Sequence, residues 1–144
     1  MTPPILPKIV NCVVEAKDNG ALTMAAGIDT KGFDFARFII LTGTTHVDAV
    51  VDPTIQECET VDGSYATITN ATHDVLAADD NVTYVVDIAL GGSRMRFLKP
   101  AWTTGNGTGT ASECAILCEL WRADSRLNTA VDSGLAAAAD WVQL

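Results

Sequence analysis

Long apolar runs and basic residues are what this sequence most lacks. No apolar stretch approaches the roughly 20 residues that a membrane-spanning helix needs, so no span is predicted. The sequence contains nine lysines and arginines and eighteen aspartates and glutamates, which gives a net charge of −9. This charge repels phosphate backbones and anionic lipid surfaces. We therefore expect no direct binding to nucleic acid or to membranes.

The N-terminus lacks the features of a secretory leader. Residues 1–7 contain three prolines and neither a basic segment nor an apolar stretch of leader length. Because proline disfavours helix, residues 1–8 are predicted to form an extended N-terminal arm. We expect a protein that is made in the cytoplasm and not exported by a signal of its own.

Residues with catalytic or metal-binding chemistry are scarce. The chain has two histidines, His46 and His73, and neither lies in an HExxH pattern. His46 lies near Asp48 and Asp52, but we interpret these residues as a solvated strand end rather than a metal site. No serine occupies a GxSxG elbow, and residues 105–109 lack the ending of a phosphate-binding loop. The sequence thus predicts no enzymatic activity, no cofactor and no metal.

The four cysteines, Cys12, Cys58, Cys114 and Cys118, contain no CxxC pair. We expect reduced thiols that are buried as small apolar side chains. A metal site and a redox pair are the alternatives.

The apolar residues that are present suffice for one core. Of 144 residues, 48% are apolar and 19% charged, which is typical of a single globular domain. Turn signals recur roughly every ten to fifteen residues, as in antiparallel sandwiches or barrels. We predict an all-β chain that folds as a single antiparallel β-sandwich domain over residues 9–126.

The strongest local pattern predicts a hairpin. Apolar residues alternate along residues 82–90 and again along residues 93–99. Gly91 and Gly92 lie between these segments and allow the positive φ that a tight hairpin turn needs. Further strands are predicted from β-branched and apolar residues at 9–15, 37–42, 48–56 and 65–68.

Residues 112–122 fit two structures. They form either a helix capped by Ser112 or a strand with Cys114 and Ile116 on one face. We favour the strand, because the glycine-rich residues 105–110 are a natural hairpin loop leading from a strand at 101–103.

The last segment, residues 127–144, changes character and is predicted to be a C-terminal arm or a short helix. Trp141 and Val142 are costly to leave in water, so we expect them to dock on this domain or on a neighbour.

The stretch from residue 33 to residue 122, together with Gly32 before it, resembles one protein family. The motifs lie at residues 32–38 (GFDFARF), 55–58 (IQEC), 62–65 (DGSY), 77–84 (AADDNVTY), 94–99 (RMRFLK) and 104–108 (TGNGT). They are similar to motifs of the small decoration, or cement, proteins that tailed bacteriophages encode beside the major capsid protein. The resemblance implies a jelly-roll-like β-sandwich that binds the outside of the phage head. The extended N- and C-terminal arms are predicted from the residues at the two ends of the chain.

The resemblance also implies partners and a location. The major capsid protein is the expected partner, on the exterior of the virion, after synthesis in the host cytoplasm. Self-association is expected, as a trimer first and a dimer next. The candidate partner-binding residues are the apolar ones at the two ends of the chain: Pro3, Pro4, Ile5, Leu6, Leu135, Trp141, Val142 and Leu144.

Two other functions are compatible with the sequence. One is a phage tail or head–tail connector component. The other is a small carbohydrate- or ligand-binding sandwich that stacks sugars on Tyr84, Trp102 or Trp121. Burial of these rings in the core is the simpler explanation.

Overall fold

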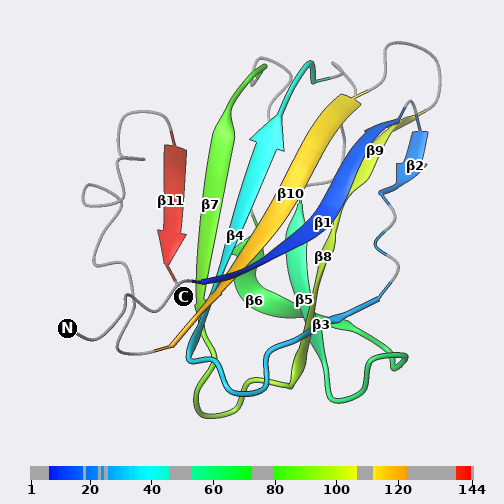
Figure 1. Cartoon of the computed structure of the whole chain (residues 1–144). Helices are drawn as coiled ribbons and strands as arrows, with labels where there is room; N and C mark the ends of the chain where they lie inside the picture. The colour runs from blue at the N-terminus through cyan, green and yellow to red at the C-terminus, as the bar shows by residue number, and fades with distance from the viewer. Residues whose placement is uncertain are drawn as a thin grey trace.

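A computed structural model describes residues 7–17, 19–22, 24, 26–45, 53–72, 80–106, 112–122 and 139–143. These residues form eleven strands and no helix (Figure 1). The strands are β1 (Lys8–Lys17), β2 (Asn19–Ala21), β3 (Ile28–Asp29), β4 (Phe35–Thr42), β5 (Thr54–Cys58), β6 (Ala66–Thr72), β7 (Thr83–Ala89), β8 (Phe97–Ala101), β9 (Thr103–Asn106), β10 (Ser112–Trp121) and β11 (Ala139–Gln143).

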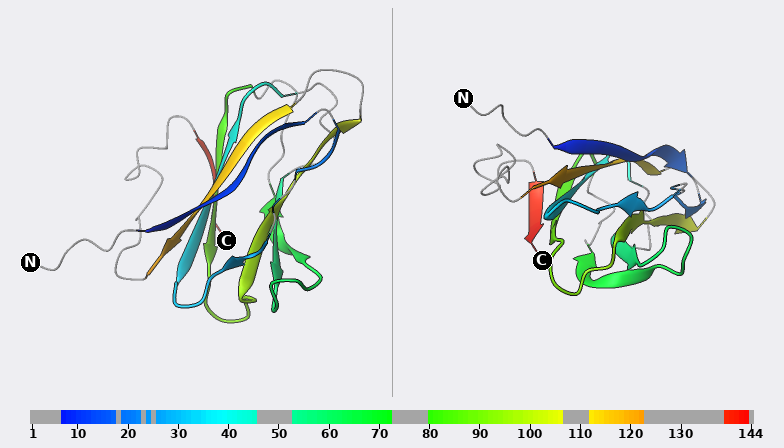
Figure 2. Two further views of the ribbon diagram at one scale, coloured as in Figure 1. Left: turned by 45° about the vertical axis from the view of Figure 1, so that its right-hand side comes forward. Right: turned by 60° about the horizontal axis from the view of Figure 1, so that its bottom comes forward.

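Two sheets form the layers of the fold (Figure 2). The five-stranded sheet has the order β1-β10-β4-β7-β11, and the four-stranded sheet has the order β3-β8-β5-β6. A small β2-β9 sheet continues from β1 and β8. Every pairing is antiparallel except the parallel pairing of β11 with β7. The predicted all-β architecture of two antiparallel sheets, arranged like a sandwich, is therefore confirmed.

The core fills the space between the two sheets. Along β10, buried residues alternate with more exposed ones, which is the pattern of a strand with one face on the core. Phe38, Ile55, Leu98 and Leu120 are fully buried. Removing such side chains from water is the main stabilising contribution to a fold of this kind.

The predicted hairpin over residues 82–99 is wrong. Both segments contain a strand, but β7 pairs with β4 and β11, whereas β8 pairs with β3 and β5. Gly91 and Gly92 therefore lie in a connection that crosses from one sheet to the other. An alternating pattern predicts a strand with one buried face. It does not predict which of the two sheets the strand joins, because the face is buried equally well in either.

The glycine-rich loop after β9 does not close a hairpin either. β9 pairs with β2, and β10 pairs with β1 and β4. The favoured interpretation of residues 112–122 as a strand is nevertheless confirmed, since β10 spans Ser112–Trp121.

The other predicted strands are found with shifted bounds. Residues 9–15 and 37–42 lie in β1 and β4, and residues 66–68 begin β6. β5 begins at Thr54, and the predicted strand residues 48–52 lie outside the described residues.

Strands that follow each other in sequence are rarely neighbours in this fold. Among the described strands, only the consecutive pair β5 and β6 lies side by side in a sheet. The chain otherwise crosses between sheets or skips a position. This topology brings β1, β10 and β4 together from distant parts of the sequence (Figure 1).

Candidate functional site

The outer face of the five-stranded sheet, which is turned away from the four-stranded sheet, is apolar over its middle strands. Val14 of β1 pairs with Ala115 of β10, which pairs with Leu41 of β4. One row further along the sheet, Leu117 pairs with Ile39. An antiparallel sheet usually places polar residues on such a face. Contiguous apolar residues here therefore indicate an interaction surface.

Exposure of this face increases toward the β1 edge. Val85 of β7 is 0% exposed, although it lies outside the main core cluster. Leu41 is 37% exposed, whereas on β1 Ile9 is 61% and Val14 79% exposed. The accessible apolar surface is thus concentrated over β4, β10 and β1.

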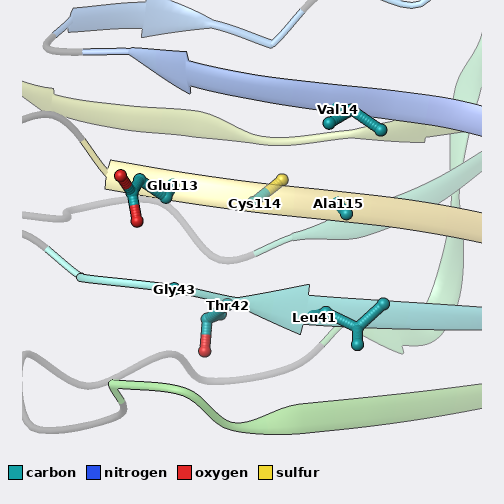
Figure 3. Close-up of a pocket in the computed structure, with 7 residues that line it drawn as sticks. All are labelled: Val14, Leu41, Thr42, Gly43, Glu113, Cys114 and Ala115. Carbon is teal, nitrogen blue, oxygen red and sulfur yellow. The ribbon is translucent and has the colours of Figure 1, made fainter.

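An open groove of about 390 Å³ lies on this exposed part, and we call it the outer groove (Figure 3). Three neighbouring strands and the turn after β4 supply its lining residues: Val14, Leu41, Thr42, Gly43, Glu113, Cys114 and Ala115.

One carboxylate, that of Glu113, belongs to this lining. The Gly43 N–H donates to the Glu113 backbone oxygen at 2.9 Å, and the Glu113 N–H donates to the Thr44 oxygen at 3.0 Å. A Cβ atom at Gly43 would lie 2.6 Å from Glu113 Oε2 and 2.9 Å from its Cβ. Glycine at position 43 therefore lets the Glu113 side chain lie against the backbone. The groove combines apolar walls with one negative charge, which suits an apolar segment that carries a basic group.

A buried ion pair lies beside the apolar rows. Arg37 Nε and Nη2 donate to the two carboxylate oxygens of Asp87 at 2.7 and 2.9 Å. The Arg37 side chain is 6% exposed and that of Asp87 19%. β4 and β7 place the two residues opposite each other. The pair satisfies two charges on a largely covered part of the outer face.

A second group of ion pairs lies at one end of the four-stranded sheet. Arg96 donates to both oxygens of Asp29, at 2.9 and 2.7 Å, and Arg94 donates to Glu57 at 3.3 Å. The hydrogen bonds from Arg96, followed by one from the Lys31 N–H, hold the pKa of Asp29 well below its usual range. Both arginines are engaged in contacts within the fold, so this group is interpreted as structural.

The cysteines have no arrangement that indicates chemistry. Cys58, Cys114 and Cys118 are buried and Cys12 is half-buried, and none of the four forms a disulfide. Burial raises the pKa of Cys12 to about 12, and burial is also the main cause of the raised pKa of Cys118. A thiol with a raised pKa is a poor nucleophile at neutral pH.

The structure describes few of the residues considered earlier for other chemistry. His46, Asp48, Asp52 and His73 lie outside the described residues. Within the described part of the chain, no three histidine, cysteine, aspartate or glutamate side chains gather as metal ligands. That part also contains no helix long and apolar enough to cross a membrane.

The aromatic residues considered for sugar stacking lie mostly in the core. Tyr84 and Trp102 are each 2% exposed, so neither ring offers a face to a ligand. Trp121 is half-buried, and its Nε1 donates to Glu119 at 3.4 Å.

Most of the candidate partner-binding residues lie outside the described residues: Pro3, Pro4, Ile5, Leu6, Leu135 and Leu144. Trp141 and Val142 belong to β11, where they pair with Val85 and Val86 of β7. Their predicted contact with a partner stays a prediction.

The residues of the outer groove were missed by the sequence prediction. Val14 follows Val13 directly, so the run looks like continuous core rather than a strand with an exposed apolar side. Leu41 looked equally like core within residues 37–42. The signal was an excess of apolar residues in these strands, but only the pairing of the strands shows which residues are exposed.

The chain was also compared with known proteins. Comparisons with protein-family models, with curated proteins and with solved structures found no match.

Proposed function

We propose that this chain is a non-enzymatic structural protein of a tailed-bacteriophage virion. It binds the outer surface of the head and holds neighbouring copies of the major capsid protein together. The outer groove is the observation that carries the proposal, because an accessible apolar sheet face on a small domain suits contact with another protein. The motifs between residues 32 and 108 resemble motifs of cement proteins, and this resemblance supports the major capsid protein as the partner.

We further propose that the sandwich is a jelly roll. β2 and β9 extend β1 and β8, and β11 adds an edge strand, so the eight main strands are β1, β3, β4, β5, β6, β7, β8 and β10. Numbered along the chain, these eight form one sheet with the order 1-8-3-6 and a second with the order 2-7-4-5. This is the strand order of a jelly roll, an architecture that viral capsid and lectin domains share. Because unrelated functions use this fold, it supports the proposal without deciding it.

Charge and multivalency support the same function. A net charge of −9 favours contact with a basic surface, and Glu113 places part of that charge at the outer groove. A contact of standard size buries about 800 Å² per partner. Repeated over a lattice of identical subunits, such contacts strengthen the shell by multivalent binding.

The test uses phage heads assembled without this protein, to which the purified chain is added. Wild-type protein should sediment with the heads and appear on their outside by cryo-electron microscopy. Leu41→Lys should lower occupancy at least about tenfold, because it places a charge in the apolar contact. Val61→Lys is the matched control, since Val61 is 38% and Leu41 37% exposed and Val61 lies in the turn before β6.

A second variant tests the N-terminal arm. Deleting residues 1–6 should weaken binding to the heads, because the arm carries four of the candidate contact residues, Pro3, Pro4, Ile5 and Leu6. Unchanged occupancy for both Leu41→Lys and the deletion would contradict the proposal. Density for the protein at the neck or tail alone would also contradict it and would favour a connector component.

A further inference from the structure

The outer groove is a trough along β10. Its floor is the short side chain of Ala115, and Val14 of β1 and Leu41 of β4 flank Ala115 on either side (Figure 3). Neighbouring strands of a sheet lie about 4.8 Å apart, so roughly 10 Å separates the two flanking strands. Because Ala115 fills little of this space, the trough has room for one apolar side chain of a partner.

The two ends of this trough differ in charge. Glu113 lies two residues before Ala115 on the same face of β10, at a separation of about 7 Å along the strand. In the other direction, the next residue of β10 on this face is the apolar Leu117. The trough is therefore apolar toward Leu117 and negative at Glu113.

The exposed Glu113 carboxylate has no basic partner among the described residues. The Thr44 N–H donates to Glu113 Oε2 at 3.5 Å, whereas Arg37, Arg94 and Arg96 form ion pairs with other carboxylates. A carboxylate at the open end of an apolar trough favours a partner that brings a cation to the same place.

We infer that the outer groove binds an extended segment of the major capsid protein in which an apolar residue and a lysine or arginine are two residues apart. The apolar side chain packs on Ala115 between Val14 and Leu41, and the basic group lies at Glu113. Side chains two apart in an extended segment lie on one face, with the same separation of about 7 Å. The identity of the partner rests on the proposed function, whereas the chemistry of the segment rests on the groove alone.

Charge favours a basic partner over a second copy of this chain. The chain has a net charge of −9, so two copies repel each other. An apolar segment without a basic residue would cover the trough but would remove water from Glu113 without replacing it. Because an exposed ion pair contributes little to affinity, Glu113 selects among segments more than it strengthens binding.

The test uses synthetic peptides and the full chain, followed by the NMR shifts of the amides of residues 113–115. A peptide with Leu-Thr-Lys in a serine- and glycine-rich background should bind. Its Leu-Thr-Glu counterpart should bind about tenfold more weakly, because it opposes like charges at Glu113. Glu113→Lys should reverse this preference. Glu59→Lys is the matched control and should keep it, since Glu59 is also exposed but follows β5 of the other sheet.

A second variant tests the apolar part of the trough. Ala115→Leu fills the space between Val14 and Leu41, so the leucine of the Leu-Thr-Lys peptide can no longer be buried there. Its binding should weaken at least about tenfold. The melting temperature should stay near that of wild type, because residue 115 points away from the core. Ala66→Leu is the control, since Ala66 is exposed on β6 and lies away from the groove.

Several outcomes overturn the inference. These are equal binding of the two peptides by wild type, a preference that Glu113→Lys does not reverse, and the absence of shifts in residues 113–115. Shifts of these amides when the protein alone is concentrated would show that a second copy occupies the groove, and would overturn it too.

The peptide measurement and the sedimentation with phage heads fail independently. Preference for the Leu-Thr-Lys peptide without binding to heads would reject the capsid protein as the partner and the proposed function with it. Binding of wild type to heads without any peptide preference would keep the proposed function and reject the inferred segment.

Discussion

Two arginines make the same contact with an aspartate in different surroundings. Arg37 and Arg96 each bind both oxygens of a carboxylate, with distances between 2.7 and 2.9 Å. The Arg37 side chain is 6% exposed and the Arg96 side chain 46%. Water screens the exposed pair, whereas an unpaired charge at the covered site has no replacement for its partner. Burial, and not geometry, therefore decides how much stability is lost when one partner of a pair is removed.

We predict that Arg37→Ala lowers the free energy of unfolding by about 3 kcal/mol, because it leaves Asp87 without its partner on a covered part of the sheet. Arg96→Ala is the matched control and should have a much smaller effect. Urea denaturation of both variants measures the difference. Equal losses would mean that Asp87 is reached by water as readily as Asp29.

The connection between β7 and β8 depends on one glycine rather than on a glycine pair. Gly92 has a φ of 73°, in the region that residues with a Cβ avoid, whereas Gly91 does not have a positive φ. Added Cβ atoms would meet nothing within 4 Å at either position. Backbone conformation alone therefore distinguishes these two glycines.

We predict that Gly92→Ala destabilises the protein by about 1 kcal/mol, the cost of the left-handed conformation for an alanine. Gly91→Ala should be neutral or slightly stabilising, since it restricts the unfolded chain without strain. Denaturant midpoints of the two variants test this. A similar loss in both would show that the turn needs two glycines, as a tight hairpin turn would.

The described part of the C-terminal tail is a strand of this domain. β11 pairs in parallel with β7 and forms the second edge of the five-stranded sheet. The backbone hydrogen bonds of this pairing stabilise the fold, in addition to any contact of the tail with a partner.

Deleting residues 139–144 should lower the free energy of unfolding by at least about 1 kcal/mol, because it removes the backbone hydrogen bonds between β11 and β7. Deleting residues 1–6, which precede β1, is the control and should change the melting temperature little. Calorimetry of both deletions provides the measurement. An unchanged melting temperature without β11 would favour a tail that is free to contact a neighbour.

At the scale of the whole molecule, the connections span long stretches of chain. Of the strands that the structure describes, β5 and β6 alone are both consecutive and paired, and β1 pairs with β10 from the other end of the domain. Loops between distant strands must close before their contacts form, which slows folding.

We therefore expect refolding with time constants of milliseconds to seconds, as in other all-β domains with distant pairings. Stopped-flow dilution from urea, followed by tryptophan fluorescence, measures it, because Trp102 becomes buried on folding. Refolding within microseconds would contradict this topology.

The sequence by itself predicted strands in the regions of β1, β4 to β8 and β10, whereas β2, β3 and β11 were not predicted as strands. The alternation in residues 112–121 and the apolar run in residues 37–42 depend only on local order along the chain, since successive side chains of a strand point to opposite faces. The alternation in residues 82–99 led to the wrong prediction of a hairpin. An alternating pattern indicates a strand, but it does not indicate which strand lies beside it.

Only the tertiary structure decided which apolar residues remain outside. Val14, Leu41 and Ala115 are distant in sequence, and each occurs in a strand that looks like core. The pairing of β1, β10 and β4 places them in one row on the outer face. Exposure is a property of the assembled layers, so the outer groove follows from the order of the strands in the sheet rather than from local pattern.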